Sequence, residues 1–490
     1  MIKKIIVGTI ILISSLKIDG QLRYERFTLD DVIRIARDQS PDAILARHRF
    51  RASYWSFRSF RANYLPSLNV SGSLPNFDRS ITWNTTTQDI VEANSITNLG
   101  RLFLSQNIGL TGGNISLSSQ LQQINILGSD GYTHYLSTPI SIQYSQPLFA
   151  FNGMKWERKI QPMLYDEAKK NYLDALEQVS LRAVGRFFDL ALAELNVRIA
   201  KLNFSNSDTL YKIAQGRYNI GTIAENDVLQ MQLSYLNAKT SLNQAEIDLA
   251  NQKARLRSYL GYNDKIDFEL ILPDSIPDIK LEYQKVMDLA MQNNPDVMSW
   301  KRRSLESERD VAQAKGNRRN INLDVSYGKI HKEAAALPEV YQKPFNDQQG
   351  FEVSLRVPIL DWGRGKGTVK MAESNEELVN VQLQQEQSDF EQNVFLQVMQ
   401  FNLQFDQVHI AAISDTIGQK RYDVTKQRFL IGRIDVLNLN DALKEKDSAK
   451  RGYISSLRGY WNYFYTLRQL TLFDFLDNKP LGEDFDQLIE

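Results

Sequence analysis

Several short segments of the chain alternate apolar and polar residues at every second position. In one of them, apolar Phe351 and Val353 flank the charged Glu352. A period of two predicts β-strands that have one apolar and one polar face. The segments with this pattern are 66–74, 139–147, 322–328 and 351–358.

Between the strands lie long charged segments whose apolar residues recur at helical spacing. From Val228 to Tyr259, apolar or small residues follow a heptad repeat, which predicts a coiled-coil seam. A second, weaker seam begins beside it at Leu229. Two adjacent seams give a helix neighbours on both sides, as in a bundle or in the wall of a tube. The alternative is an antiparallel hairpin packed on a globular core.

The predicted helix lengths bear on that choice. A helix over 155–216 would extend about 93 Å, whereas the returning helix over 223–260 would extend about 57 Å. A third helix, which Pro41 opens and which runs for about 25 residues, would supply roughly the missing length. Two short helices stacked end to end could therefore match one long helix. Such lengths favour a conduit across a wide compartment over a compact domain.

The same plan occurs twice along the chain. At an offset of 211 residues Gly221 aligns with Gly432, and at an offset of 254 residues 27–43 aligns with 281–297. The first copy therefore carries about 43 extra residues, which lie between 70 and 139. A period this long indicates a duplicated domain. The predicted organisation is a signal peptide (1–20), a first repeat (21–262), a linker (263–280), a second repeat (281–474) and a C-terminal tail (475–490).

Charge is unevenly distributed. The chain has 58 Lys and Arg against 58 Asp and Glu, which argues against a nucleic-acid partner. Lys3, Lys4 and the apolar run that follows them predict a secretory signal peptide rather than a membrane anchor, because the run is short for a span. Between Leu102 and Met154 the only formally charged residue is Asp130. Charge-poor alternating strands are typical of a membrane barrel; a half-buried sheet on a soluble core is the alternative.

The sequence offers no constellation typical of a catalytic or cofactor site. Cysteine is absent, and the four histidines lie far apart. The segment 361–368, DWGRGKGT, lacks the spacing of a phosphate-binding loop. Carboxylates on the predicted helices are mixed with Lys and Arg, which predicts solvated surface. We therefore expect no cofactor, no metal site and no enzyme activity.

Taken together, the duplication and segments such as FTLDDVIRIARDQSPDA, QPLFAFNGMKW and VPILDWGRGK resemble the TolC-like outer-membrane efflux family. The resemblance covers about residues 27–475. It implies an α+β membrane protein: a homotrimer whose chains share a 12-stranded outer-membrane β-barrel, continued by a long α-helical barrel in the periplasm. An extra hairpin near 101–126 departs from four strands per chain; it would lengthen the barrel wall, raise the count to 18 in the trimer, or form an external loop.

The resemblance also implies a function. The protein would be the outer-membrane channel of a tripartite efflux or secretion system, a passive conduit with an iris-like gate. Its partners would be a periplasmic adaptor protein, an inner-membrane pump and outer-membrane lipid. A periplasmic coiled-coil adaptor or scaffold protein is the alternative function.

Two glycines, Gly221 and Gly432, mark the predicted tips of the helical hairpins, where glycine permits a positive φ. By resemblance, the tips form the adaptor-docking surface, and the residues after them form the gate. Of the two acidic gate positions in the family, this chain keeps one, and an arginine lies one residue earlier than expected. The docking residues are Arg217, Tyr218, Ile220, Gly221, Arg428, Phe429, Ile431 and Gly432; the gate candidates are Asp227, Asn438, Asp441 and Arg433.

Overall fold

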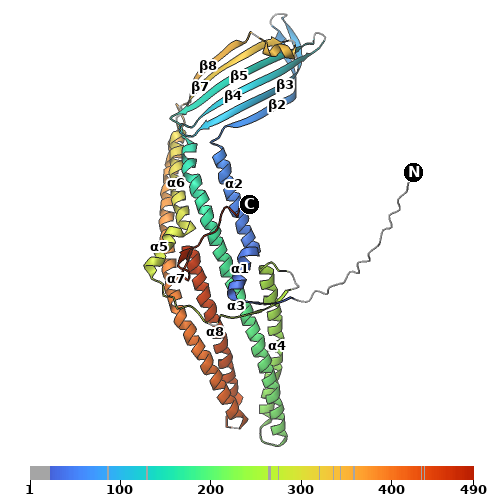
Figure 1. Cartoon of the computed structure of the whole chain (residues 1–490), viewed down its shortest axis with the longest axis vertical. Helices are drawn as coiled ribbons and strands as arrows, with labels where there is room; N and C mark the ends of the chain where they lie inside the picture. The colour runs from blue at the N-terminus through green and yellow to red at the C-terminus, as the bar shows by residue number, and fades with distance from the viewer. Residues whose placement is uncertain are drawn as a thin grey trace, which may run out of the picture. The chain divides into compact units, whose positions relative to one another are not determined.

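A computed structural model of the chain falls into two compact units (Figure 1). The hairpin unit comprises Met1–His48, Tyr172–Gln292 and Gln392–Glu483, and the sheet unit comprises Arg49–Asn171, Asn293–Glu391 and Asp484–Glu490. The residues that the structure describes are 23–84, 88–128, 131–262, 266–273, 275–318, 320–334, 336–342, 344–356, 359–431, 433–434 and 436–489. The predicted signal peptide lies outside them.

The α-helices follow the same order in both halves of the chain, but the first half has four strands between its second and third α-helices, whereas the second half has two. The helices are α1 (Leu29–Gln39), α2 (Pro41–Ala62), α3 (Gly153–Asn219), α4 (Glu225–Tyr259), α5 (Tyr283–Asn293), α6 (Pro295–Gly316), η1 (Leu337–Tyr341), α7 (Arg364–Leu430) and α8 (Val436–Thr471). The strands are β1 (Arg23–Phe27), β2 (Ser67–Asn84), β3 (Asp89–Ile108), β4 (Gly113–Leu127), β5 (Thr133–Leu148), β6 (Ile266–Leu270), β7 (Asn320–Ala334), β8 (Asn346–Arg356), β9 (Phe473–Asp474) and β10 (Lys479–Pro480).

Corresponding helices have nearly equal lengths. Helices α1 and α5 have 11 residues each, α2 and α6 have 22, and α3 and α7 have 67. The two returning helices, α4 and α8, have 35 and 36 residues. The predicted element order is therefore present, while a common origin of the halves stays a prediction. One departure is strand β6, which lies inside the predicted linker and pairs in parallel with β1.

The sheet unit holds a six-stranded antiparallel sheet in the order β2-β3-β4-β5-β7-β8. Strands β3 and β4 contain the extra hairpin that the sequence predicts near 101–126. Gly112, with φ +78°, lies in the turn between them. Each of these two strands pairs on both sides. The chain thus contributes six strands to one sheet, instead of the four that the family resemblance implies.

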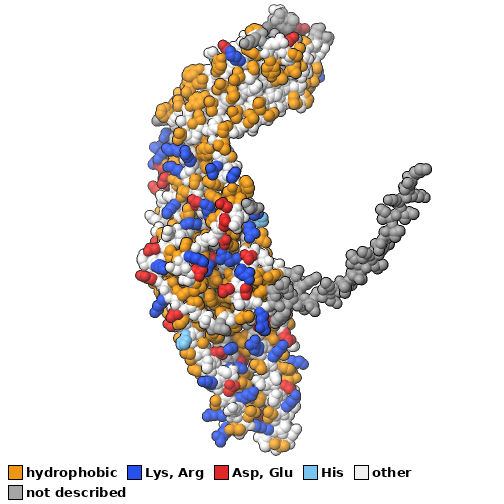
Figure 2. Space-filling view, in the orientation of Figure 1, with side chains coloured by type: hydrophobic (Ala, Val, Ile, Leu, Met, Phe, Trp, Pro, Cys, Tyr) orange, Lys and Arg blue, Asp and Glu red, His pale blue; other side chains and the backbone are white. Residues whose placement is uncertain are grey.

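One face of the sheet is apolar and exposed to solvent. Register places Leu68 opposite Leu104, Leu104 opposite Leu117, and Leu117 opposite Ile142, so that leucine and isoleucine form a row across four strands. All four side chains are exposed in the isolated chain, and apolar side chains cover much of the sheet in Figure 2. An exposed apolar surface of this extent marks an interaction site. Among the described helices, none combines the length and the apolarity needed to cross a membrane.

In the hairpin unit the predicted heptad seam joins α4 to α3. Tyr235 stacks between Phe204 and Tyr211, with ring centroids 5.4 and 6.0 Å apart, and Ala245 packs in a cluster with Val197. This confirms the seam. The second seam, represented by Leu229, Leu233, Leu236 and Ile247, is 50–63% exposed. The described residues of one chain therefore leave that face of α4 uncovered.

Helix α2 begins where α4 ends, as the length argument predicts. Gly261, with φ +75°, follows α4, and a Cβ atom there would lie 3.1 Å from the Gln39 carbonyl oxygen just before α2. Both helix ends contact the same stretch of α3: Arg182 pairs with Asp42 at 3.2 Å, and the Tyr259 hydroxyl donates to the Val179 carbonyl at 2.9 Å. Burial raises the pKa of Tyr259 to about 12.

A buried carboxylate joins three helices of the hairpin unit, against the expectation that the helix carboxylates are solvated. Glu177 of α3 is fully buried and accepts from Arg37 of α1 at 2.9 Å and from Arg468 of α8 at 3.1 and 3.2 Å. Arg468 also donates to Asp474 at 2.6 Å, and Arg37 donates to Glu483 at 3.3 Å. These five residues form the ion cluster.

Loss of the charge on Glu177 should destabilise the protein strongly. Glu177→Gln removes the one fully buried carboxylate that Arg37 and Arg468 share, and breaking a buried ion pair typically costs about 3–5 kcal/mol in unfolding free energy. The measurement is denaturant unfolding in detergent, followed by tryptophan fluorescence. The control is Glu246→Gln: Glu246 pairs at 3.7 Å with Lys201 on the exposed surface, so we expect a change within about 0.5 kcal/mol. Equal effects of the two variants would contradict the prediction.

Candidate functional site: the hairpin tips and the groove above them

At the first tip, the backbone changes direction at a glycine. Helix α3 ends at Asn219, and Gly221 has φ +72°. The Gly221 amide donates to the Tyr218 carbonyl at 2.8 Å, and the Thr222 amide donates to the Arg217 carbonyl at 3.0 Å. These bonds satisfy carbonyls that the end of a helix leaves free. The predicted role of Gly221 as a helix terminator is thus visible in the backbone.

At the second tip, a backbone hydrogen bond of the same spacing closes the end of the helix. Helix α7 ends at Leu430, and the Arg433 amide donates to the Arg428 carbonyl at 3.0 Å. Gly432 itself lies outside the described residues. Arg217 of the first tip donates to the Leu430 carbonyl at 3.3 Å. A cation at the C-terminal end of a helix is favourable, so Arg217 stabilises the end of α7 and connects the two tips.

The predicted docking residues fall into two groups by burial. Tyr218, Ile220 and Ile431 are exposed, and the last two are 74% and 66% exposed. Phe429 is buried in a cluster with Tyr422, Leu439 and Ala442, against which Leu210 and Ile434 also pack. The first group is available to a partner protein, whereas Phe429 holds α7 and α8 together.

A cavity of about 540 Å³ opens beside the tips and brings predicted docking and gate residues together. Arg217 and Asp227 supply its charged groups, and the rest of its lining is mainly apolar. Its lining residues are Leu210, Ile213, Ala214, Arg217, Ile220, Thr222, Ile223, Asp227, Met231, Phe429 and Ile434.

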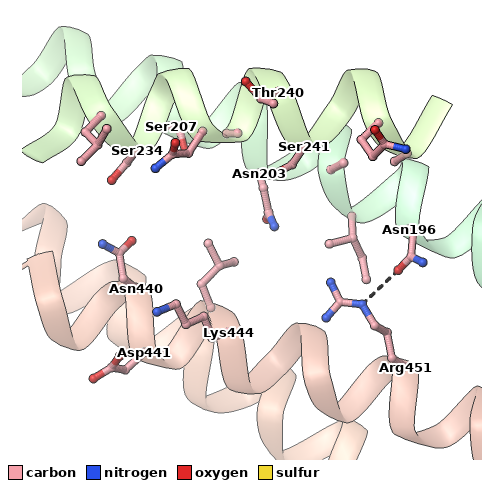
Figure 3. A pocket seen from close by; sticks show the side chains of 18 of the residues that line it. Asn196, Asn203, Ser207, Ser234, Thr240, Ser241, Asn440, Asp441, Lys444 and Arg451 are labelled. Atoms are coloured by element: carbon pink, nitrogen blue, oxygen red, sulfur yellow. Dashed lines mark hydrogen bonds between the residues drawn. The ribbon is translucent and has the colours of Figure 1, made fainter. Parts of the chain in front are cut away.

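Asp441 lies at a different place, in a polar groove of about 910 Å³ between α8 and the α3–α4 hairpin (Figure 3). Asn440, Asp441 and Lys444 of α8 line the groove together with serine, threonine, asparagine and glutamine side chains of α3 and α4. Arg451 donates to Asn196 at 2.9 Å across it. The gate candidates therefore do not form one cluster in a single chain: Asp227 lines the tip cavity, and Asn438 and Arg433 are exposed.

Sequence reasoning missed a set of polar links between α3 and the α7–α8 hairpin. Asn203 donates to Asp447 at 2.7 Å, and Asn206 donates to the Tyr422 hydroxyl at 3.2 Å. Lys426 donates to Asn206 at 3.2 Å. Burial raises the pKa of Tyr422, which keeps its hydroxyl protonated. The partners lie more than 200 residues apart in the sequence, and no local pattern marks them.

Substitution by alanine should have opposite effects on stability at Gly221 and at Gly216, two glycines near the first tip. Gly221→Ala places a Cβ in a left-handed backbone and should cost about 1–2 kcal/mol. Gly216→Ala, in the helical part of α3 with open space around its Cβ position, should stabilise the helix by up to about 1 kcal/mol. Hydrogen exchange of the amides around the tip measures both. Faster exchange in both variants, or in neither, would contradict the prediction.

Comparison with known proteins gives a family and a fold. Residues 32–262 match the sequence profile of the family described as outer membrane efflux protein. No curated protein matches the chain.

Three solved structures illustrate the fold. The CmeC outer membrane channel of Campylobacter jejuni is 16% identical with a TM-score of 0.68, over 94% of this chain and 88% of that one. VceC, an outer membrane protein of Vibrio cholerae, is 12% identical with a TM-score of 0.63, over 93% and 97%. The MtrE outer membrane channel of Neisseria gonorrhoeae, in its open state, is 14% identical with a TM-score of 0.60, over 93% and 90%. At these identities the similarity establishes the fold alone.

Proposed function

The chain belongs to the outer membrane efflux protein family through residues 32–262, and we propose that three copies form the outer-membrane channel of a tripartite efflux or secretion system. The channel is a passive conduit, with its sheet in the outer membrane and its helical tunnel in the periplasm. It works with a periplasmic adaptor and an inner-membrane pump, and without chemistry of its own.

The six-stranded sheet carries this proposal. Among the described residues, β2 and β8 each pair on one side only, and free edges of amphipathic strands invite pairing with another chain. Pairing β8 of one copy with β2 of the next closes three sheets into an 18-stranded barrel. Its apolar face would meet lipid and its serine- and glutamine-rich face would line water, as in porin-sized barrels.

The helices support assembly of several copies independently. On α7, Leu396, Leu403, Ile410, Ile417 and Val424 recur every seven residues and are 50–62% exposed. This spacing is typical of a coiled-coil seam. The uncovered second seam of α4 is its counterpart, so α4 of one copy and α7 of the next can bury both faces in a closed ring of helices.

The tips provide the docking surface for the adaptor. Tyr218, Ile220 and Ile431 are exposed apolar or aromatic residues, the type that anchors protein interfaces. Arg217, which bonds the end of α7, and the polar links of α3 to α7–α8 hold the tips together. In the trimer, Asp441 forms a ring of three carboxylates at the constriction.

Acidic residues on the exposed face of α7 should prevent assembly. Leu403→Asp with Ile410→Asp would bury a charge at every interface between copies, which costs several kcal/mol unless it is paired. We expect a more than tenfold loss of heat-resistant trimer on seminative gels. The control, His409→Asp with Thr416→Asp, makes the same charge change at exposed positions of the same helix and should leave the trimer intact. A trimer unaffected by the first pair would contradict the proposal, and detergent-free solubility of the mature chain would favour an adaptor or scaffold instead.

Neutralising Asp441 should change conduction. Asp441→Asn removes three carboxylates from the proposed ring, so that polyvalent cations should block the current several-fold more weakly in planar bilayers. Asp415→Asn is the control: this carboxylate already pairs with Lys450 at 2.7 Å, and block should be unchanged. Identical block in wild type and Asp441→Asn would remove Asp441 from the constriction.

A further inference from the structure

The end of the sheet that adjoins the helices carries an excess of positive charge. Segments 57–66, 149–160, 313–319 and 359–370, which join strands to helices and which we name the strand–helix rim, contain eleven Lys and Arg against two Asp and Glu. The whole chain has equal numbers of each. The ten of these cations that lie among the described residues are all exposed: Arg58, Arg61, Lys155, Arg158, Lys159, Lys315, Arg318, Arg364, Lys366 and Lys370. Figure 2 shows Lys and Arg gathered directly below the sheet.

This excess is confined to one end of the strands. Segments 78–92, 128–134 and 329–347, at the other end of the same strands, contain four Lys and Arg against seven Asp and Glu. Solubility alone would not require such a difference. Within the described part of the rim, Lys315 and Lys370 are the only cations that form ion pairs, and both pair with Glu373, at 3.1 and 2.9 Å. Most of the positive charge in the described part of the rim therefore forms no ion pair with a described acidic residue.

Large apolar side chains stand among these cations. Phe149 and Trp362 are 84% and 89% exposed, and both have a left-handed backbone, with φ of 60° and 53°. Non-glycine residues rarely adopt this conformation, and they often do so at functional positions. Leu65 and Ile359 are likewise exposed at the rim. The rim thus continues the apolar face of the sheet and adds charge to it.

One cavity at the rim is lined by both cationic and apolar side chains. It has a volume of about 640 Å³ and is lined by Phe149, Lys315, Gly316, Arg318 and Ile321. Phe149 and Ile321 belong to the apolar side, whereas Lys315 and Arg318 can donate hydrogen bonds to an anion. The Asp361 carboxylate near Arg318 accepts from the Gly365 and Gly363 amides, at 2.8 and 3.0 Å, and these bonds lower its pKa.

We propose that the strand–helix rim binds anionic phospholipids of the leaflet that faces the helices. Lys315, Arg318 and the other rim cations bind the headgroup phosphates, while Phe149 and Trp362 lie at headgroup depth and the acyl chains continue along the apolar face of the sheet. Basic clusters next to a membrane-embedded element attract anionic lipid, and aromatic rings favour this depth. The inference rests on the proposed placement of the sheet in a membrane.

The test measures lipid that stays with the protein. The full chain is reconstituted into vesicles of phosphatidylcholine, with and without phosphatidylglycerol, then extracted in detergent and analysed by native mass spectrometry. We expect wild type to retain phosphatidylglycerol preferentially. Lys315→Gln with Arg318→Gln should weaken that preference about tenfold, since each basic residue near the surface contributes attraction. Lys239→Gln with Lys420→Gln, exposed on α4 and α7 of the hairpin unit, is the matched control and should retain as much as wild type.

The outcomes separate this inference from the proposed function. Insertion of wild type into phosphatidylcholine vesicles without any preference for phosphatidylglycerol would overturn the lipid site and leave the channel proposal standing. An equal loss in the Lys315/Arg318 variant and in the control would also overturn it, because general charge would then explain retention. Failure of wild type to insert into either vesicle would overturn the membrane placement itself, and the lipid site with it.

Discussion

The hairpin unit depends on one buried negative charge. Glu177 sits in the middle of a helix of 67 residues with no exposed surface, where an isolated carboxylate would be prohibitively costly. Its cost is offset only if Arg37 and Arg468 reach it together, which fixes α1 and α8 against α3. Arg468 then recruits Asp474, whose other oxygen accepts from the Leu476 amide at 2.9 Å and shapes the turn after β9. One charge thereby orders four segments that are distant in sequence.

The tips are held in a different way. Near the ion cluster, charged groups are buried and multiply bonded; among the described residues at the very ends of the hairpins, one arginine–carbonyl bond joins the two tips beside a small apolar cluster. Local stability follows such differences in burial and bonding. Such a hairpin would suit the docking and gating that we propose for the tips, because a change at the tip would leave the ion cluster untouched.

Patterns local in sequence predicted much of this structure, and contacts between distant segments account for what they missed. The heptad after Val228 predicted the α3–α4 seam, and Gly221 marked a helix end, because spacing and φ preference are local properties. The burial of Glu177 could not be read from a segment that looks like any charged helix face. The burial of Phe429 could not be predicted either. The tip motif gives the position of Phe429 along the chain, but its burial depends in part on Leu210, which belongs to the other hairpin and packs against the same apolar cluster. The strand count was open because an alternating segment predicts a strand and does not reveal its neighbours.

The edges of β2 and β8 that pair with no other described strand also bear on how the protein folds. A single chain with two free strand edges beside a broad apolar face is prone to aggregate with any extended segment that it meets. If three copies assemble as proposed, the other two must reach the sheet soon after it forms, or a chaperone must shield it until they do. In the proposed trimer, folding and oligomerisation would then be one event, and the stability of each subunit would depend on the concentration of the protein.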